Sequence, residues 1–178
     1  MSKIIFQIAQ PNDLNQIATL HANSWQQNNR GILSDDFLDN KVHEERLTAW
    51  TQRFQNPAKH QYILTAKAQN QVVGFTCLFG GKHARYGTYL DNLHIAKEWK
   101  GKGIGKQLMA LAGDWAAKNY PNQGLYLLVF AANTPAIGFY ERIGGKKMET
   151  APYDLGDGTG RLGSTHLYYW ENPQSLVT

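Results

Sequence analysis

The stretch "WKGKGIGKQL", residues 99–108, alternates glycine with lysine and then passes into a helical pattern. The N-terminus of a helix carries unpaired backbone N–H groups and the positive end of the helix dipole, so it binds anions. Glycines let a large anion come close to the backbone and permit the positive φ angles of an anion-binding turn. The stretch therefore predicts a site for a diphosphate, formed by Lys100, Gly101, Lys102, Gly103, Gly105 and Lys106.

Two common phosphate-binding loops do not fit this spacing. A P-loop has four residues between its first glycine and its Gly-Lys pair, followed by Ser or Thr for magnesium. Here three residues separate Gly101 from Gly105, and Gln107 follows Lys106. The dinucleotide-binding fingerprint requires glycine where Lys106 stands, and it belongs beside the first strand of a parallel unit. Neither a metal-phosphate site nor a dinucleotide site is expected.

The composition is typical of a soluble globular protein, with 42% hydrophobic and 18% charged residues in a chain of 178. We expect residues 1–178 to form a single domain, because no repeat, low-complexity tract or linker interrupts them. No apolar run approaches the length of a membrane span, and the N-terminal segment is too short and too polar for a signal peptide. A cytoplasmic location without a membrane partner is expected.

Charge, cysteine and histidine content exclude several other kinds of site. A net charge of +4 suits a phosphorylated ligand and does not by itself indicate nucleic acid, so no nucleic-acid partner is expected. The one cysteine, Cys77, lies in a strand-like run and is expected to be a small core residue. The six histidines show no short ligand spacing, so no metal is expected.

Strand and helix patterns follow one another in the order β-α-α-β-β-β-α-β-α-β-β. We expect strands in residues 3–9, 61–68, 72–80, 86–95, 124–130, 146–155 and 164–171, and helices in 11–25, 42–54, from 104 onward and in 134–143. This order predicts a mixed sheet with helices on both faces, and not a doubly wound Rossmann domain.

Local signals place the helix ends and one helix face. Ser34 and Thr134 are expected to be N-caps, with Pro135 at the first helical position and a glycine at 144 or 145 beyond the end. The helix in 42–54 is expected to have one largely apolar side, made by Val42, Leu47, Trp50 and Phe54.

Two motifs in order resemble those of the GCN5-related N-acetyltransferase (GNAT) family. The family motif R/Q-x-x-G-x-G/A is matched by residues 100–105, with lysine in the usual arginine or glutamine position. The later Asn…Ala…Tyr-Glu motif is matched by Asn133, Ala136, Tyr140 and Glu141. The resemblance is specific over residues 88–145, and the order of strands and helices agrees elsewhere.

The resemblance implies an α/β fold of the α+β type. It implies a mixed, mostly antiparallel sheet of about seven strands, splayed after the fourth, with helices on both faces. The co-substrate would be acetyl-CoA, with its pyrophosphate on the glycine loop and its pantetheine arm on the backbone of the preceding strand. The implied cofactor-binding residues are Leu93, His94, Ile95, Lys100, Gly101, Lys102, Gly103, Ile104, Gly105, Lys106, Asn133 and Ala136.

Acetyl transfer to an amine by direct attack needs a neutral amine, stabilisation of a tetrahedral oxyanion and departure of a thiolate. Asp91 lies where family members often carry a glutamate that serves as the base. The alternatives for Asp91 are a strand-edge carboxylate that keeps the sheet soluble and a group that binds the cationic substrate. His94 is a second candidate base, although strand alternation would turn it to the face opposite Asp91. A water relay is a third.

Tyr140 matches the general acid of the family, and on helical pattern alone it would be a core residue. A phenol with a pKa of about 10 is a weaker acid than a thiol with a pKa of about 8.5. We therefore expect the Tyr140 hydroxyl to donate a hydrogen bond to the leaving thiolate, with the proton arriving late. A backbone N–H of the splayed strand would bind the oxyanion.

The acceptor is expected opposite the cofactor, between residues 24–37 and the loop in 153–164. The candidate substrate-binding residues are Trp25, Arg30 and Asp154. We expect an N-acetyltransferase acting on a primary amine, with a small molecule favoured over a protein N-terminus or lysine. A non-catalytic acyl-CoA sensor is the alternative from another class. Family members are often dimers, so a homodimer is implied by analogy alone.

Overall fold

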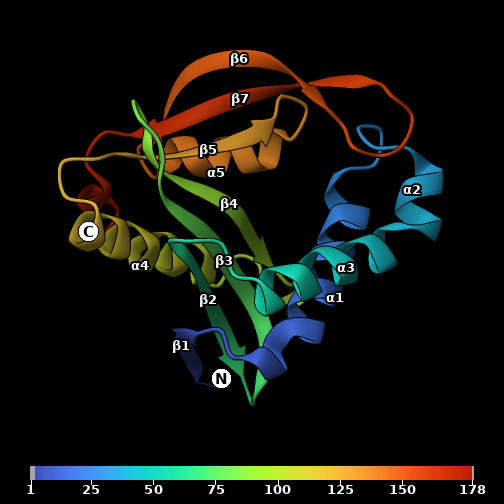
Figure 1. Ribbon diagram of the computed structural model, residues 1–178, viewed down its shortest axis with the longest axis horizontal. Helices are drawn as coiled ribbons and strands as arrows, with labels where there is room; N and C mark the ends of the chain where they lie inside the picture. Colours follow the sequence, from blue (N-terminus) through green and yellow to red (C-terminus); the bar gives the residue numbers. More distant parts are fainter. Residues whose placement is uncertain (1–2, 178) are drawn as a thin grey trace.

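A computed structural model describes residues 3–177 of the chain (Figure 1). The strands are β1 Ile4–Ile8, β2 Gln61–Ala68, β3 Gln71–His83, β4 Gly87–Ile95, β5 Leu125–Phe130, β6 Lys146–Asp154 and β7 Leu162–Trp170. The helices are α1 Leu14–Asn28, α2 Asp35–Asn40, α3 Val42–Gln55, α4 Ile104–Asn119 and α5 Thr134–Arg142, with short 3-10 turns η1 Pro11–Asp13, η2 Lys97–Trp99 and η3 Pro173–Val177. Residues 1, 2 and 178 of the expected domain lie outside the described residues.

The sheet opens between its two central strands. Its seven strands run in the order β1-β2-β3-β4-β5-β7-β6, and all neighbouring pairs are antiparallel except β4 with β5. That parallel pair consists of two residue pairs, Thr88 with Leu125 and Tyr89 with Tyr126. Beyond them β4 and β5 diverge (Figure 1). The predicted fold class, including the splay after the fourth strand, is confirmed.

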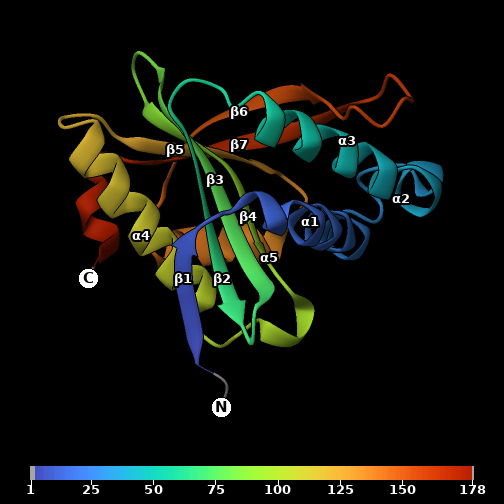
Figure 2. The same ribbon diagram turned by 60° about the horizontal axis from the view of Figure 1, so that its bottom comes forward.

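Helices cover both faces of the strands that precede the opening. On one face, Phe75 and Cys77 of β3 pack in a cluster with Ile17 of α1 and Trp50 of α3. On the other face, Leu78 of β3 packs in a cluster with Met109 and Ala112 of α4. Since side chains alternate along a strand, these contacts place the two helix layers on opposite faces. Figure 2 shows α4 and the α1–α3 layer on the two sides of β2, β3 and β4.

The N-terminal helices differ from the predicted pattern in two ways. An additional short helix, α2, begins after Ser34, whose hydroxyl accepts a hydrogen bond from the Phe37 N–H at 3.3 Å, so the predicted cap is confirmed. In α3, Val42 and Trp50 are buried, but Leu47 is 43% exposed. The prediction for Leu47 was wrong because five residues after Val42 correspond to a rotation of about 140° around the helix.

The cap of α5 also differs from the prediction. Asn133 is the N-cap, and its Oδ1 accepts a hydrogen bond from the Ala136 N–H at 3.3 Å, while Thr134 is already helical. The helix ends as expected before Gly144, which has a φ of +85°. The amide oxygen of Asn133 reaches the N–H three residues ahead, so the cap falls one residue earlier than predicted.

We expect Gly113→Ala to destabilise the protein, although alanine is normally the better helix former. A Cβ at position 113 of α4 would lie 2.4 Å from the Pro173 carbonyl oxygen and 3.0 Å from Leu176, in the C-terminal turn η3. Overpacking of this kind costs about 1–3 kcal/mol. The free energy of unfolding, measured by urea denaturation, tests the effect.

Gly138→Ala in α5 is the matched control. Its Cβ would approach only the Arg142 guanidinium, at 3.3 Å, and that flexible side chain can move. We expect a gain of about 0.5–1 kcal/mol from helix propensity. Equal losses of stability in the two variants would contradict the close packing of η3 on α4.

Candidate active site

The glycine loop forms a run of unpaired backbone donors at the start of α4. Gly101 and Gly103 have φ angles of +77° and +79°, and a Cβ added at either one would meet nothing within 4 Å. Within residues 3–177, no hydrogen bond is made by the backbone N–H groups of residues 101–106; the first to be paired is that of Gln107, which donates to the Gly103 carbonyl at 3.0 Å. Donors of this kind at a helix N-terminus suit a diphosphate.

The three lysines of the loop have different surroundings. Lys100 donates to the Asn28 Oδ1 of α1 at 3.2 Å, and the Lys102 ammonium lies 4.4 Å from the centre of the Trp99 ring. Lys106 lines a groove of about 490 Å³ between α4, α5 and η3, together with Met109, Phe139, Arg142, Ile143, Ser175 and Leu176. Arg142, which the sequence did not single out, thus adds a second positive charge to the groove that Lys106 lines.

A bulge in β4 lies directly after the point where β4 leaves β5. Leu78 pairs with Leu90 and Cys77 pairs with Asn92, so Asp91 is an extra residue in the strand. A bulge resets the alternation of side chains between the two faces of a sheet. His94 therefore faces α1 and α3, as Asp91 does, and the prediction that the two lie on opposite faces was wrong.

His94 is a neutral group held against α1. Its Nδ1 is 2.8 Å from the Ser24 hydroxyl, and its ring centre is 4.4 Å from that of the buried His21. Burial, helped by the positive charges of Arg46 and Lys100, lowers the pKa of His94 to about 3. A histidine with such a pKa is a weak base at neutral pH, which disfavours His94 as the proton acceptor.

Asp91 is paired with an arginine that sequence reasoning missed. The Arg53 Nη2 lies 2.7 Å from the Asp91 Oδ2, and both side chains are largely covered, with 27% and 21% of their surface exposed. Arg53 also lies 3.7 Å from the sulfur of Cys77, and burial raises the pKa of that thiol to about 12. The expectation that Cys77 is a core residue is confirmed. No local motif in the sequence connects Arg53 of α3 with β4.

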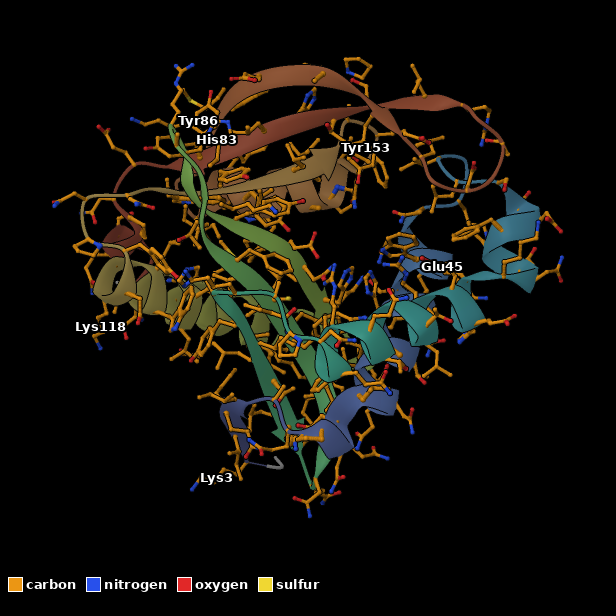
Figure 3. All side chains as sticks on the ribbon, in the orientation of Figure 1. Lys3, Glu45, His83, Tyr86, Lys118 and Tyr153 are labelled. Atoms are coloured by element: carbon orange, nitrogen blue, oxygen red, sulfur yellow. The ribbon has the colours of Figure 1, made fainter. Side chains whose placement is uncertain are left out.

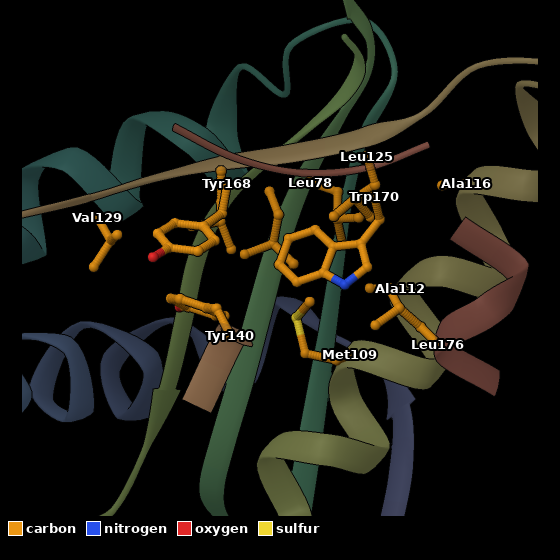
Figure 4. Close-up of a cluster of buried hydrophobic side chains, with 12 residues drawn as sticks. Leu78, Met109, Ala112, Ala116, Leu125, Val129, Tyr140, Tyr168, Trp170 and Leu176 are labelled. Carbon is orange, nitrogen blue, oxygen red and sulfur yellow. The ribbon is translucent and has the colours of Figure 1, made fainter. Parts of the chain in front are cut away.

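Tyr140 belongs to the core and to the candidate site at once. It is 8% exposed and packs near Tyr168 and Trp170, with ring centres 6.3 Å and 6.1 Å away (Figure 4). Burial raises the pKa of Tyr140. Its hydroxyl makes no hydrogen bond to any of residues 3–177, whereas the Tyr168 hydroxyl bonds Glu141 at 2.7 Å. The Tyr140 hydroxyl is therefore available to a ligand.

The candidate acceptor residues lie in different settings. The rings of Trp25 and His21 are in edge-on contact, with their centres 5.0 Å apart, and the Arg46 guanidinium lies 4.3 Å from the centre of the Trp25 ring. Arg30 is exposed and pairs with Asp35 and Asp39. Asp154 is exposed and accepts a hydrogen bond from the Gly156 N–H at 2.9 Å. Of the three candidates, Trp25 is the one that contacts His21, and His21 in turn packs against His94.

The two segments predicted to hold the acceptor are joined by hydrogen bonds. Asp157 accepts from the Ser34 N–H at 2.8 Å, and Arg161 donates to the Ile32 carbonyl at 3.2 Å. Hydrogen bonds from Thr159, and from the Ser34 N–H, hold the pKa of Asp157 well below its usual range. The sequence placed Asp157 on the expected acceptor loop but gave it no role, because its partner Ser34 lies more than a hundred positions away.

A groove of about 530 Å³ runs between these joined loops and α3. It is lined by Phe37, Lys41, Glu44, Glu45, Thr48, Ala49, Gln52, Gly156, Asp157 and Gly158. Glu45 on α3 and Tyr153 on β6 lie on two sides of the space between the α3 layer and the second half of the sheet (Figure 3). The groove places carboxylates near the expected acceptor side, a feature that the linear sequence does not reveal.

Metal sites and membrane-spanning helices are absent from the described part of the chain. Among residues 3–177, no group of three or more His, Cys, Asp or Glu side chains is arranged to hold a metal ion. In the same part of the chain, no helix combines the length and the apolar character that crossing a bilayer requires.

Fold and site together define an acyltransferase-like architecture, and comparison with known proteins names the family. The sequence profile described as the Acetyltransferase (GNAT) family matches residues 23–145. The chain belongs to the GNAT family. The resemblance expected from the two sequence motifs is confirmed.

Two curated proteins are similar over part of their length. The uncharacterized N-acetyltransferase YobR of Bacillus subtilis (strain 168) is 28% identical over 123 residues, which cover 67% of this chain and 47% of that protein. A probable spermine N(1)-acetyltransferase of Bacillus subtilis subsp. natto (strain BEST195) is 36% identical over 56 residues, covering 32% and 37%. The chain spans less than half the length of these curated relatives.

Solved structures share the fold at low sequence identity. The PaiA N-acetyltransferase of Thermoplasma acidophilum, in complex with coenzyme A, has a TM-score of 0.70 at 22% identity, over 94% of this chain and 99% of that one. NAA60 of Arabidopsis thaliana, in complex with a bisubstrate analogue, has a TM-score of 0.68 at 18% identity, over 94% and 98%. These likenesses support the fold assignment.

Proposed function

We propose that residues 1–178 form a single acetyl-CoA-dependent N-acetyltransferase domain that acetylates a primary amine of a small molecule. The observation that carries the proposal is the run of unpaired N–H groups in residues 101–106, next to the edge of β4 that β5 leaves uncovered. Family membership supports the reaction class. The name of the spermine N(1)-acetyltransferase relative supports a small amine over a protein.

Several elements suit the co-substrate, which supplies an activated acyl thioester when bound. The N–H groups of residues 101–106 would hold the diphosphate, and Lys106 and Arg142 would offer positive charge in the neighbouring groove. The backbone of residues 93–95 lies beyond the last β4–β5 pair, so its outer edge can bind an extended arm as an added strand does. The Asn133 Nδ2 group can donate a hydrogen bond to this ligand, because the α5 cap uses only Oδ1.

Asp91 and Tyr140 would act on the reacting groups. In our proposal the Asp91 carboxylate takes the proton from the incoming amine. The Tyr140 hydroxyl donates a hydrogen bond to the departing sulfur, because its raised pKa makes full proton transfer to a thiolate unfavourable. A backbone N–H of β4 beyond Tyr89 would bind the oxygen that gains negative charge.

The acceptor would enter from the side of α1, α3 and the β6–β7 loop. Trp25 is the sequence-derived candidate that lies near His94, and we propose that it contacts the acceptor. Arg30 and Asp154 are proposed for the outer part of the path, on the loops that Asp157 and Arg161 tie together. The cytoplasmic location and the homodimer expected from the sequence stay predictions.

Release of CoA thiol, measured over a panel of amines, peptides and amine-containing antibiotics, tests this proposal. We expect turnover with at least one small primary amine. Turnover with peptides alone would overturn the small-molecule part of the proposal. Binding of acetyl-CoA without turnover of any amine would overturn the enzymatic part and favour a sensor. The absence of any heat on calorimetric titration with CoA would overturn the cofactor site itself.

Gly103→Ala should weaken acetyl-CoA binding by about tenfold. Alanine disfavours the φ of +79° at this position by about 1–2 kcal/mol, which would rotate the N–H groups away from the diphosphate. The dissociation constant, measured by calorimetry, tests this effect. Gly160→Ala is the control, since Gly160 has a φ of +69° and equally open surroundings in the β6–β7 loop. Equal affinity losses in both variants would contradict the assignment of the loop.

Tyr140→Phe should lower kcat by about tenfold or more and leave KM for acetyl-CoA nearly unchanged, because it removes a donor that acts on the leaving group. Tyr168→Phe is the matched control: it removes a neighbouring hydroxyl whose partner is Glu141. We expect it to reduce stability and to leave kcat within about twofold. An unaltered kcat in Tyr140→Phe would remove Tyr140 from the mechanism.

A further inference from the structure

Arg53 bridges two consecutive residues of the β4 bulge. From the last turn of α3, its Nη2 lies 2.7 Å from the Asp91 Oδ2, and its Nη1 donates to the Asn92 Oδ1 at 2.9 Å. In a regular strand, neighbouring side chains point to opposite faces, so a single group does not contact both. The extra residue in β4 brings both side chains to one face, and Arg53 connects them there.

The guanidinium is held in one orientation by its surroundings. It lies 4.9 Å from the centre of the Trp50 ring and 5.5 Å from that of Phe79. The Trp50 ring is itself fixed, because its Nε1 donates to the Nδ1 of the fully buried His21 at 3.0 Å. A planar fork between aromatic rings loses little further freedom when it binds two acceptors.

The bridge lies where the sheet opens. The last pair between β4 and β5 is Tyr89 with Tyr126, and Asp91 follows two residues later. From β3, the Thr76 hydroxyl donates a hydrogen bond to the Asn92 carbonyl at 2.8 Å. Arg53 thus contacts the segment of β4 between the last β4–β5 pair and the unpaired backbone of residues 93–95.

We propose that Arg53 is the positioning residue of this centre: by binding Asp91 and Asn92 together, it maintains the bulge and aims the carboxylate at the incoming amine. The inference rests on the proposed function, in which Asp91 accepts the proton. Arg53 contacts neither substrate in this scheme and acts through Asp91. A lysine cannot replace it, because one ammonium group does not reproduce the two separate contacts.

The other titratable groups around Asp91 and Arg53 are uncharged at neutral pH. They come from four different elements: His21 of α1, Cys77 of β3, Tyr89 of β4 and Tyr126 of β5. Burial lowers the pKa of His21 and raises the pKa values of Cys77, Tyr89 and Tyr126, so each favours its neutral form. Within residues 3–177, Arg53 is the one cation in an ion pair with Asp91.

The variants Arg53→Gln and Arg53→Lys test the proposal through kcat, KM for the best amine of the panel and the dissociation constant for acetyl-CoA. We expect kcat to fall about tenfold or more in both, because the carboxylate is no longer aimed. The dissociation constant for acetyl-CoA should stay within about twofold.

A double-mutant cycle with Asp91→Asn separates positioning from general support of the fold. If Arg53 acts through Asp91, Arg53→Gln lowers kcat little further once Asp91→Asn is present. Arg46→Gln is the matched control, because Arg46 also lies on α3, pairs with a carboxylate, that of Glu45, and stacks on a tryptophan, Trp25. We expect its effect to be the same in the presence and in the absence of Asp91→Asn.

The outcomes that overturn the inference differ from those that overturn the proposed function. A full kcat in Arg53→Gln, or an equal loss of kcat with and without Asp91→Asn, would show that Arg53 does not position the base. A full kcat in Asp91→Asn would remove the base and the inference together, while turnover of the amine remains. If Arg53→Gln does not fold, as judged by its melting curve, Arg53→Lys carries the same cycle.

Discussion

Two residue pairs between β4 and β5 are the constraint on which the rest of the structure depends. If β4 and β5 stayed paired along their whole length, neither strand would have an unpaired edge at the centre of the sheet. Because pairing stops at Tyr89 and Tyr126, the edge of residues 93–95 that faces away from β3 has no strand partner, and the bulge at Asp91 lies at the inner end of this unpaired segment. The helices then bring further groups to this segment: the glycine loop leads into α4, Arg53 of α3 pairs with Asp91, and Tyr140 of α5 belongs to the cluster against which Leu93 packs.

Features encoded within a few residues were predictable from the sequence. The positive φ angles at Gly101 and Gly103, the cap at Ser34 and the end of α5 at Gly144 each depend on local backbone chemistry, and all are confirmed. The error at the start of α5 is of one residue, because Asn133 and Thr134 are both good caps and only geometry distinguishes them.

Features that depend on distant partners were not predictable in the same way. The register shift that makes Asp91 an extra residue arises from pairing with β3, and one shifted residue changes which face every later side chain of β4 occupies. His94 was assigned to the wrong face for that reason. The roles of Arg53 and Asp157 depend on their contacts, with β4 and with Ser34 respectively, and no spacing in the sequence indicates those contacts.

The buried state of Cys77 has a practical consequence for work on this protein. It is the only cysteine of the chain, it is fully covered by β3, α1 and α3, and burial raises its pKa to about 12. Thiol reagents attack the thiolate, which is scarce at such a pKa. Colorimetric thiol reagents can therefore follow the release of free coenzyme without a signal from the protein. A surface cysteine introduced for a fluorescent probe would be the one residue that the probe labels.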